Sequence, residues 1–342
     1  MTNKVWSLLE DLNQKKGITE VVINGPKKVF VERAGQFIQL NYPIPLEDLH
    51  DFANEVANNN STSFSDEDPI IDGRLPDGSR INIIHEKFSQ GAPAITIRKY
   101  LKSINSFDQN PNIFGLNEHW VKLLKAMVSS RMNVIVSGGT GVGKTTFMNL
   151  MLAELSQAER VITIEDTIEL AINIPNVVRL EGSFAGKNKN GIGARDLVRN
   201  TLRMRPDRII IGEVRGGELF DLLQAMNTGH DGSMSSVHAS SPAECLSRIE
   251  NLFLMAGFDV PNHVVRKQIA MGIDFIIQIT RDREGNRVLG SILELTGMEG
   301  NNILSQQIAL REEGEIVSTG ITPKNIEKLC RMGGLEKDFF NQ

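Results

Sequence analysis

Residues 134–146 read Val-Ile-Val-Ser-Gly-Gly-Thr-Gly-Val-Gly-Lys-Thr-Thr, and this stretch decides the fold. The apolar run Val134 to Val136 predicts a short buried strand. Gly138 to Thr145 follow at once and satisfy the pattern G-x-x-x-x-G-K-[ST], and the next residues carry a helical pattern. The stretch therefore predicts a strand, a phosphate-binding loop and a helix, in that order.

The predicted loop is suited to hold a nucleoside triphosphate. Its glycines let backbone N–H groups turn inward around the phosphates. Lys144 would place its charge on the β and γ phosphates, and Thr145 would offer its hydroxyl to Mg²⁺. The residues predicted to bind the nucleotide here are Gly138, Gly139, Thr140, Gly141, Val142, Gly143, Lys144, Thr145 and Thr146.

Carboxylates follow two further apolar runs. The run from Arg208 ends at Glu213, as the Walker B strand of a nucleotide hydrolase ends in an acid, and Glu213 would order Mg²⁺, partly through water. Glu165 and Glu169 follow the run 162–164, which places them at the carboxyl edge of a parallel sheet. A carboxylate is needed to orient the water that attacks the γ-phosphate. We predict Glu169 as that base, with Glu165 as the alternative.

Histidines and arginines complete the candidates. His230 and His238 flank the run 234–237, and no third ligand at metal spacing accompanies them, so zinc is excluded and a place beside the γ-phosphate competes with ordinary burial. An arginine from the same chain or a neighbouring subunit commonly offsets charge on a transferring phosphoryl group. The candidates are Arg80, Arg98, Arg199, Arg203, Arg205 and Arg215, and a solvated surface arginine is the alternative for each.

The pattern of elements predicts two domains. Residues 1–102 combine amphipathic helices with short strands, which is an α+β pattern, and residues 103–115 are polar and predicted as a linker. In residues 116–342, apolar strands alternate with helices, which predicts a mainly parallel sheet covered on both faces, with a hairpin over 275–293. The meander expected in the first domain uses 20–23, 29–31 and 37–40.

Composition describes a folded protein without strong electrostatic bias. The 342 residues are 40% hydrophobic and 23% charged, which excludes a disordered or fibrous chain. A net charge of -5 provides no positive field for nucleic acid. Cys245 and Cys330 lie far apart, which favours a reducing compartment over a disulfide framework. No apolar stretch approaches the roughly 20 residues of a membrane span, so membrane association is expected to be peripheral.

Together, these motifs resemble those of the type II/type IV secretion system ATPases, and most of all the CpaF branch, the motors of tight-adherence pili. Residues 202–215 fit the Walker B signature of this superfamily, and residues 216–218, Gly-Gly-Glu, resemble the CpaF branch. Residues 224–239 resemble its His box and residues 164–169 its Asp box. The likeness extends into the first domain through residues 22–26, 74–80 and 96–99.

The resemblance implies an α/β fold class, with an N-terminal α+β (PAS-like) domain followed by a RecA-like P-loop core. It also implies a site to which both domains contribute. The predicted catalytic set is Glu169, Glu213, Glu165, Lys144, His238, Arg203 and Arg215, and the further nucleotide contacts are Arg80, Arg98 and His230.

The same resemblance implies a homo-hexameric motor that uses ATP and Mg²⁺ in the cytoplasm, at the cytoplasmic face of the inner membrane. Its partner would be a membrane platform protein, and motion of the N-terminal domain against the core would assemble a tight-adherence pilus or a related type II secretion machine. Retraction stays open, and the alternative is a conjugation-type (type IV secretion) export ATPase. A nucleic-acid motor is disfavoured by the acidic balance.

Two departures limit this resemblance. The chain lacks the paired cysteines of the type II secretion and type IVa pilus extension motors, and residues 182–193 differ from the usual family stretch and predict a loop. A regulator that binds nucleotide without hydrolysis is disfavoured because Lys144, Thr145, Glu169 and Glu213 are all present.

Overall fold

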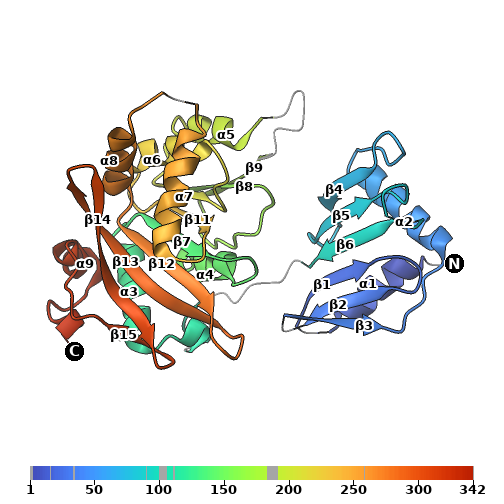
Figure 1. Cartoon of the computed structure of the whole chain (residues 1–342), viewed down its shortest axis with the longest axis horizontal. Coiled ribbons are helices and arrows are strands. Elements are labelled where there is room, and N and C mark those ends of the chain that lie inside the picture. The colour runs from blue at the N-terminus through green and yellow to red at the C-terminus, as the bar shows by residue number, and fades with distance from the viewer. Residues whose placement is uncertain are drawn as a thin grey trace. The chain divides into compact units, whose positions relative to one another are not determined.

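The chain divides into two compact units, Met1–Lys102 and Ser103–Gln342. A computed structural model, drawn in Figure 1, describes residues 3–15, 17–33, 35–89, 91–99, 106–110, 112–182, 192–257 and 259–341. Most of the loop predicted over 182–193 lies outside these ranges.

The described part of the first unit is a six-stranded sheet in the order β3-β2-β1-β6-β5-β4, and every neighbouring pair is antiparallel. Buried residues alternate along β1 and β5, and these apolar side chains form one core with those of the two helices. The predicted meander and α+β pattern are confirmed. The elements are α1 (Lys4–Asn13), β1 (Ile18–Ile23), β2 (Val29–Arg33), β3 (Gln36–Leu40), α2 (Leu46–Asn59), β4 (Ile70–Arg74), β5 (Arg80–Ile84) and β6 (Ala94–Arg98).

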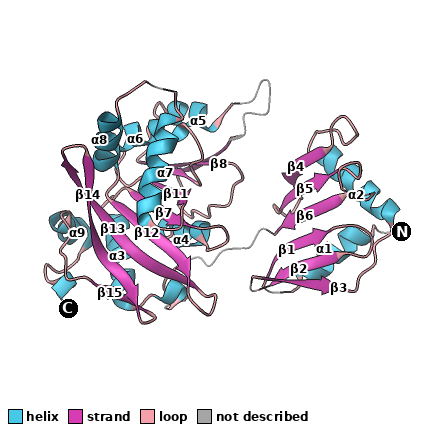
Figure 2. Ribbon diagram, viewed as in Figure 1, coloured by secondary structure: helices cyan, strands magenta, loops and turns pink. Residues whose placement is uncertain are grey.

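The second unit is built on a nine-stranded sheet in the order β15-β14-β13-β12-β7-β11-β10-β8-β9 (Figure 2). The six strands β12, β7, β11, β10, β8 and β9 are each parallel to their neighbours among these six. The four strands β12, β13, β14 and β15 form antiparallel pairs in that order. The predicted parallel sheet and the hairpin of β12 and β13 are therefore confirmed.

The bounds in the first half of this unit are η1 (Ile113–Gly115), α3 (Glu118–Ser129), β7 (Val134–Gly138), α4 (Lys144–Leu152), β8 (Val161–Glu165), β9 (Val177–Glu181), α5 (Ala194–Thr201), β10 (Arg208–Ile211) and α6 (Glu218–Met226). They continue with β11 (Met234–His238), α7 (Pro242–Leu254), α8 (Asn262–Gly272), β12 (Phe275–Arg281), β13 (Arg287–Glu299), β14 (Asn302–Glu312), β15 (Glu315–Ser318), α9 (Ile326–Gly333) and η2 (Phe339–Asn341).

The central strands are rich in apolar residues because both faces of the sheet are covered. One core joins the sheet to α3, α4 and α9, and a second joins its other face to α5, α6, α7 and α8. Every residue of β7, β8 and β10 is buried. This double burial is what the continuous apolar runs in the sequence predict.

The segment predicted as a linker, residues 103–115, belongs in part to the second core. Residues 103–105 and 111 lie outside the described residues, but Phe107 and Phe114 are buried in the core of the second unit. Two aromatic side chains carry enough apolar surface to draw an otherwise polar segment onto a core. The parts of the segment around Phe107 and Phe114 therefore pack with the P-loop unit.

A buried ion pair joins β10 to the loop before β8. Arg208, only 2% exposed, donates from Nε and Nη2 to the two carboxylate oxygens of Glu159 at 2.9 and 3.0 Å. Its Nη2 also donates to the carbonyl of Val128 at the end of α3, 2.9 Å away. Arg131 approaches the same carboxylate at 2.8 Å. Removing one partner of such a pair leaves an uncompensated charge inside the protein.

We expect Glu159→Ala to lower the free energy of unfolding by about 3–5 kcal/mol, because Arg208 would stay buried without its carboxylate. Urea unfolding followed by the fluorescence of Trp120, in a Trp6→Phe background, measures this in the second unit alone. Glu336→Ala, which removes the exposed ion pair with Lys122, is the control and should cost about 0–1 kcal/mol. A loss of that small size for Glu159→Ala would contradict the interpretation.

Candidate nucleotide-binding and catalytic site

The predicted phosphate loop connects β7 to α4, as expected. Gly141 and Gly143 have φ values of 70° and 98°, in the left-handed region that favours glycine. A Cβ atom at Gly138 would lie 2.6 Å from the carbonyl oxygen of Ile279 in β12, so this position also requires glycine. The loop is thus shaped by its own glycines and by close contact with the neighbouring strand.

Three residues that the sequence analysis did not single out support this loop. Arg281 donates from Nη2 to the carbonyl of Gly141 at 3.0 Å. A Cβ atom at Gly143 would lie 3.1 Å from Arg287 and 3.2 Å from the ring of Phe114. These residues are far from the loop in sequence, and no local pattern marks them.

Lys144 lies at the first position of α4 with its side chain folded over the loop. Its Nζ donates to the carbonyls of Gly138 and Gly139 at 3.1 and 2.9 Å. Both ring nitrogens of His238 lie 3.3 Å from the same Nζ. The ammonium is therefore held at the carboxyl edge of the sheet, where the loop would receive phosphates.

Charged side chains continue from Lys144 along this edge. His238 Nε2 lies 3.1 Å from Glu213 Oε2, and Arg215 Nε donates to Glu213 Oε1 at 2.9 Å. Arg215 Nη1 reaches Asp166 Oδ2 at 3.4 Å. The structure thus brings together Lys144, His238, Glu213 and Arg215 from the predicted catalytic set, and it adds Asp166.

The surroundings keep Glu213 ionised. Burial alone would raise its pKa, but the hydrogen bond from Arg215, the charges of Arg215 and Lys144 and, when it is protonated, the charge of His238 outweigh burial and hold the pKa of this carboxyl below its ordinary value. Burial, aided by Lys144, outweighs the attraction of Glu213 and lowers the pKa of His238. A neutral His238 beside a carboxylate at Glu213 is therefore the state at neutral pH.

Glu165 and Glu169 occupy different environments. Glu165 is 2% exposed, and its Oε2 accepts the backbone N–H groups of Glu169 and Leu170 at 2.7 and 2.8 Å. Burial raises the pKa of Glu165, although these hydrogen bonds oppose the rise. Glu169 is half-buried and lies within the electrostatic reach of Arg215. Glu165 thus organises the loop that carries Glu169, which favours Glu169 as the base.

Two predicted site residues lie elsewhere in the chain. His238 pairs with Gly138, whereas Met234 at the start of β11 pairs with Val134, so β11 begins at the edge opposite the phosphate loop. His230 precedes that start, and its Nδ1 lies 3.3 Å from the carbonyl of Ala225. Arg203 is exposed and precedes β10 in the same way. The structure therefore does not bring His230 or Arg203 to the phosphate loop of the same chain.

The other predicted arginines are placed as follows. Arg199 donates to Asp221 at 3.0 Å and so joins α5 to α6. In the first unit, Arg98 lies opposite Arg80 and Arg80 opposite Arg74, in one row across three strands. Their neighbours Ile81 and Ile97 are buried, so the row lies on the face of the sheet that turns away from α1 and α2.

Thr145 and Glu213 fit the prediction of a magnesium site. Both supply oxygen, the ligand type that Mg²⁺ prefers, and this ion is usually held by one or two protein groups together with water and substrate phosphates. Among the described residues, no group of three or more His, Cys, Asp or Glu side chains could hold a metal by itself.

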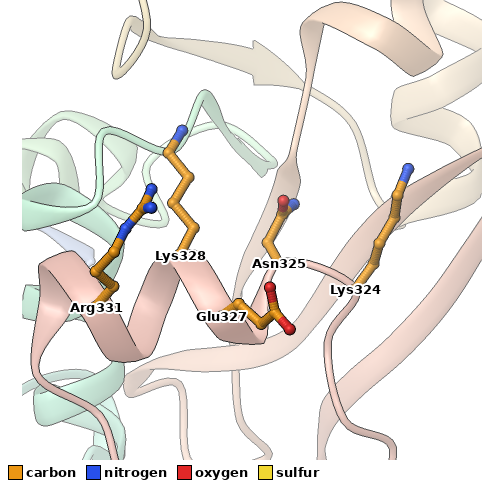
Figure 3. A pocket seen from close by; sticks show the side chains of 5 residues that line it. All are labelled: Lys324, Asn325, Glu327, Lys328 and Arg331. Carbon is orange, nitrogen blue, oxygen red and sulfur yellow. The ribbon is translucent and has the colours of Figure 1, made fainter.

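A separate hollow lies beside α9 and is not part of this site. It has a volume of about 320 Å³ and is lined by Lys324, Asn325, Glu327, Lys328 and Arg331 (Figure 3). Lys324 donates to the carbonyl of Thr296 at 3.0 Å, and Lys328 to that of Arg131 at 3.3 Å. Since Arg131 precedes β7, the hollow lies toward the edge opposite the phosphate loop.

The fold and this arrangement define the second unit as a RecA-like P-loop nucleoside triphosphatase core. Residues 4–308 match the family model described as Type II/IV secretion system protein, so the chain belongs to that family.

Several relatives are similar over most of their length. A putative conjugal transfer protein of Mycobacterium tuberculosis is 32% identical over 303 residues, which are 86% of this chain and 85% of that protein. The conjugal transfer protein TrbB of Rhizobium radiobacter is 31% identical, with 88% and 91% covered. The type IV secretion system protein VirB11 of Bartonella quintana is 30% identical, with 78% and 85% covered. These matches do not distinguish the CpaF branch.

Solved structures share the fold. The ATPase DotB of Legionella pneumophila is 19% identical with a TM-score of 0.64, covering 100% of this chain and 86% of that one. The pilus retraction motor PilT, solved with ADP, is 21% identical with a TM-score of 0.62, covering 87% and 84%. These likenesses support the predicted fold class of an N-terminal domain and a RecA-like core. Within the described residues, no helix has the length and apolar character needed to cross a bilayer.

We expect Glu165→Gln to keep the loop intact, because an amide oxygen can still accept the two N–H groups, whereas Glu165→Ala removes the acceptor. The pKa of Glu165 is higher in the native state than in the unfolded chain, where it is 4.5, so the native state holds the proton more tightly. As the pH rises above 4.5, ionisation of Glu165 therefore lowers the free energy of unfolding of the wild-type protein. The Gln variant should therefore gain stability relative to wild type between about pH 5 and pH 8.

Urea unfolding at both pH values, followed by Trp120 fluorescence in the Trp6→Phe background, measures this difference. Glu181→Gln is the control, since Glu181 is the exposed register partner of Glu165 in β9. A Gln variant that loses stability relative to wild type as the pH rises would contradict the assignment.

Proposed function

We propose that the chain is a Mg²⁺-dependent ATP hydrolase that drives a conjugation-type, type IV secretion export machine. The observation that carries hydrolysis is the row of Lys144, His238, Glu213 and Arg215 at the mouth of the phosphate loop. The machine is proposed from the relatives, since those at 30–32% identity carry the names conjugal transfer protein and VirB11. ATP, rather than GTP, is proposed from the ATPases that share the fold.

In the proposed reaction, the loop N–H groups and Lys144 bind the phosphates. Glu169 orients a water molecule and takes its proton, while the water oxygen bonds to the γ-phosphorus and the bond to the β–γ bridging oxygen breaks, releasing ADP and phosphate. Thr145 and, through water, Glu213 would hold Mg²⁺, which would supply positive charge to offset that of the phosphate oxygens. His238 lies between Lys144 and Glu213 and so responds to the loss of the γ-phosphate.

The N-terminal domain is proposed to contribute the row of Arg80 and Arg98. In this row Arg98 lies between Arg80 and Glu20, and a polyanion placed over the two arginines would offset the repulsion between them. Nucleotide would then draw the two domains together, and its hydrolysis would release them. His230 and Arg203, at the edge opposite the phosphate loop of their own chain, would serve the site of a neighbouring subunit in a hexamer.

The proposed working complex is a homo-hexamer at the cytoplasmic face of the inner membrane, bound peripherally to a membrane platform protein. A tight-adherence pilus motor is the second candidate, proposed from the resemblance of residues 216–218 to the CpaF branch. Glu218 of the CpaF-like stretch accepts the N–H groups of Arg215 and Gly216 at 2.5 and 2.8 Å, so this stretch orients the arginine that binds Glu213. Deleting the gene and scoring conjugative transfer and surface pili separately distinguishes the two machines.

We expect Glu169→Gln and Glu213→Gln to lower ATP turnover by about 10²–10⁴-fold while nucleotide binding persists, because each removes charge needed at the transferring group and leaves Lys144 in place. Phosphate release with Mg²⁺ measures turnover, and light scattering after size exclusion, with and without nucleotide, measures the oligomer. Glu181→Gln, at an exposed position in β9, is the matched control and should turn over ATP as wild type does. Undiminished turnover in both active-site variants would overturn the proposal.

We expect Arg98→Ala to lower kcat by at least about tenfold if the N-terminal domain completes the site. Arg33→Ala is the matched control, since Arg33 is exposed at the end of β2 in the same sheet. It lies two residues from Val31 and therefore on the face that carries the helices, opposite the face of Arg98. Steady-state ATP turnover on both variants is the measurement. An Arg98→Ala protein that hydrolyses ATP like wild type would exclude the contribution of this domain.

A further inference from the structure

The segment 169–171 after β8 lies outside the helices and strands, and side chains satisfy its backbone groups. The N–H groups of Glu169 and Leu170 donate to Glu165. The N–H of Ala171 donates to Oδ1 of Asn149 at 2.9 Å, and Nδ2 of Asn149 donates to the carbonyl of Glu169 at 3.3 Å. Two buried side chains therefore hold the backbone that carries Glu169.

Asn149 is an unusual residue for its position. It is 3% exposed, on a helix whose neighbouring positions Met148 and Leu150 are fully buried. Asparagine is a weaker helix former than leucine, and a buried amide is costly unless it is hydrogen-bonded. The oxygen and the nitrogen of the Asn149 amide both hydrogen-bond to residues 169–171. These contacts between helix and loop explain why an amide is found at this buried position.

The helix that carries Asn149 is the one that begins at the phosphate loop. Lys144 and Asn149 are five residues apart on α4, or about 7.5 Å along the helix axis. A single rigid turn and a half of helix thus connects the groups that would receive the γ-phosphate with the amide that holds Glu169. Together with Glu165, this helix would therefore fix the separation between a phosphate bound in the loop and Glu169.

We propose that Asn149 is a positioning residue that couples the phosphate-binding helix to the loop of Glu169. The proposal rests on the proposed function, in which Glu169 orients the attacking water. Removing the amide would leave the phosphate contacts in place and allow the loop to move relative to them. Displacements of about 1 Å at a reacting group can cost a hundredfold in rate.

The test uses the full-length protein and compares Asn149→Leu with Asn149→Asp. Leucine has a similarly branched side chain but removes both hydrogen bonds, while aspartate keeps an acceptor for the Ala171 N–H. Gln157→Leu is the matched control, because Gln157 also donates to a carbonyl of the following segment, that of Asn173, at 3.2 Å. Fluorescent ADP binding, thermal melting and single-turnover hydrolysis of radiolabelled ATP are measured on each variant.

We expect Asn149→Leu to lower the hydrolysis rate by about 10–100-fold with ADP affinity changed less than about threefold, Asn149→Asp to lose less, and Gln157→Leu to behave as wild type. The decisive measurement repeats Asn149→Leu in a Glu169→Gln background. A residue that acts through Glu169 should cost little further there, whereas a merely structural residue lowers both backgrounds equally.

The outcomes separate the two proposals. A slow Glu169→Gln protein beside a normal Asn149→Leu protein overturns the coupling alone, as does an equal loss in both backgrounds. A fully active Glu169→Gln protein overturns the proposed role of Glu169 and the coupling with it. If Asn149→Leu does not fold, Asn149→Asp carries the same cycle, since it changes the charge and removes the donor to Glu169 while keeping the side-chain volume.

Discussion

The register of β7 between β11 and β12 is the constraint on which the rest of the site depends. Gly138, the last residue of β7, lies opposite His238 on one side and Ile279 on the other. The close approach of Ile279 leaves space only for glycine and starts the phosphate loop there. The same register places the imidazole of His238 against Lys144. A shift of one residue would turn each of these side chains to the other face of the sheet.

Alternating charges hold this edge together. Lys144, Glu213, Arg215 and Asp166 follow one another with opposite signs, and a neutral His238 lies between the first two. Each carboxylate is thus matched by a cation before any ligand is considered. The lowered pKa of Glu213 is the consequence, because ionisation is favoured by the neighbouring positive charges despite burial. A phosphate entering the loop would compete with Glu213 for the same cations.

Two buried polar side chains behind the site, Glu165 and Asn149, hold backbone groups of the loop after β8. Glu165 and Asn149 together bind three N–H groups and one carbonyl of residues 169–171, in a segment that lies outside the helices and strands. Burying a carboxyl costs stability, which the raised pKa of Glu165 reflects. At the opposite edge of the sheet, the Glu159–Arg208 pair likewise buries charged groups that hydrogen-bond to each other. Both clusters specify one arrangement of the loops that join the strands.

The sequence by itself determined the local elements. The phosphate loop, the central strands, the hairpin of β12 and β13, the acid that ends β8 and the acid that follows β10 could all be predicted. Glycine loops and apolar runs are dictated by backbone sterics and burial within a few residues. Strands β9, β14 and β15 and the helices α8 and α9 were not predicted, since their burial is partial and irregular.

Only the tertiary structure decided which of these residues meet. It drew Phe107 and Phe114 into the core, brought Arg281 to the phosphate loop and gave Asn149 its two partners in the loop of Glu169. It also separated His230 and Arg203 from the loop of their own chain, because residues that precede parallel strands lie at the edge opposite the one where such strands end. These contacts join residues that are distant in sequence, and their geometry is set by strand order and register, which no local pattern encodes.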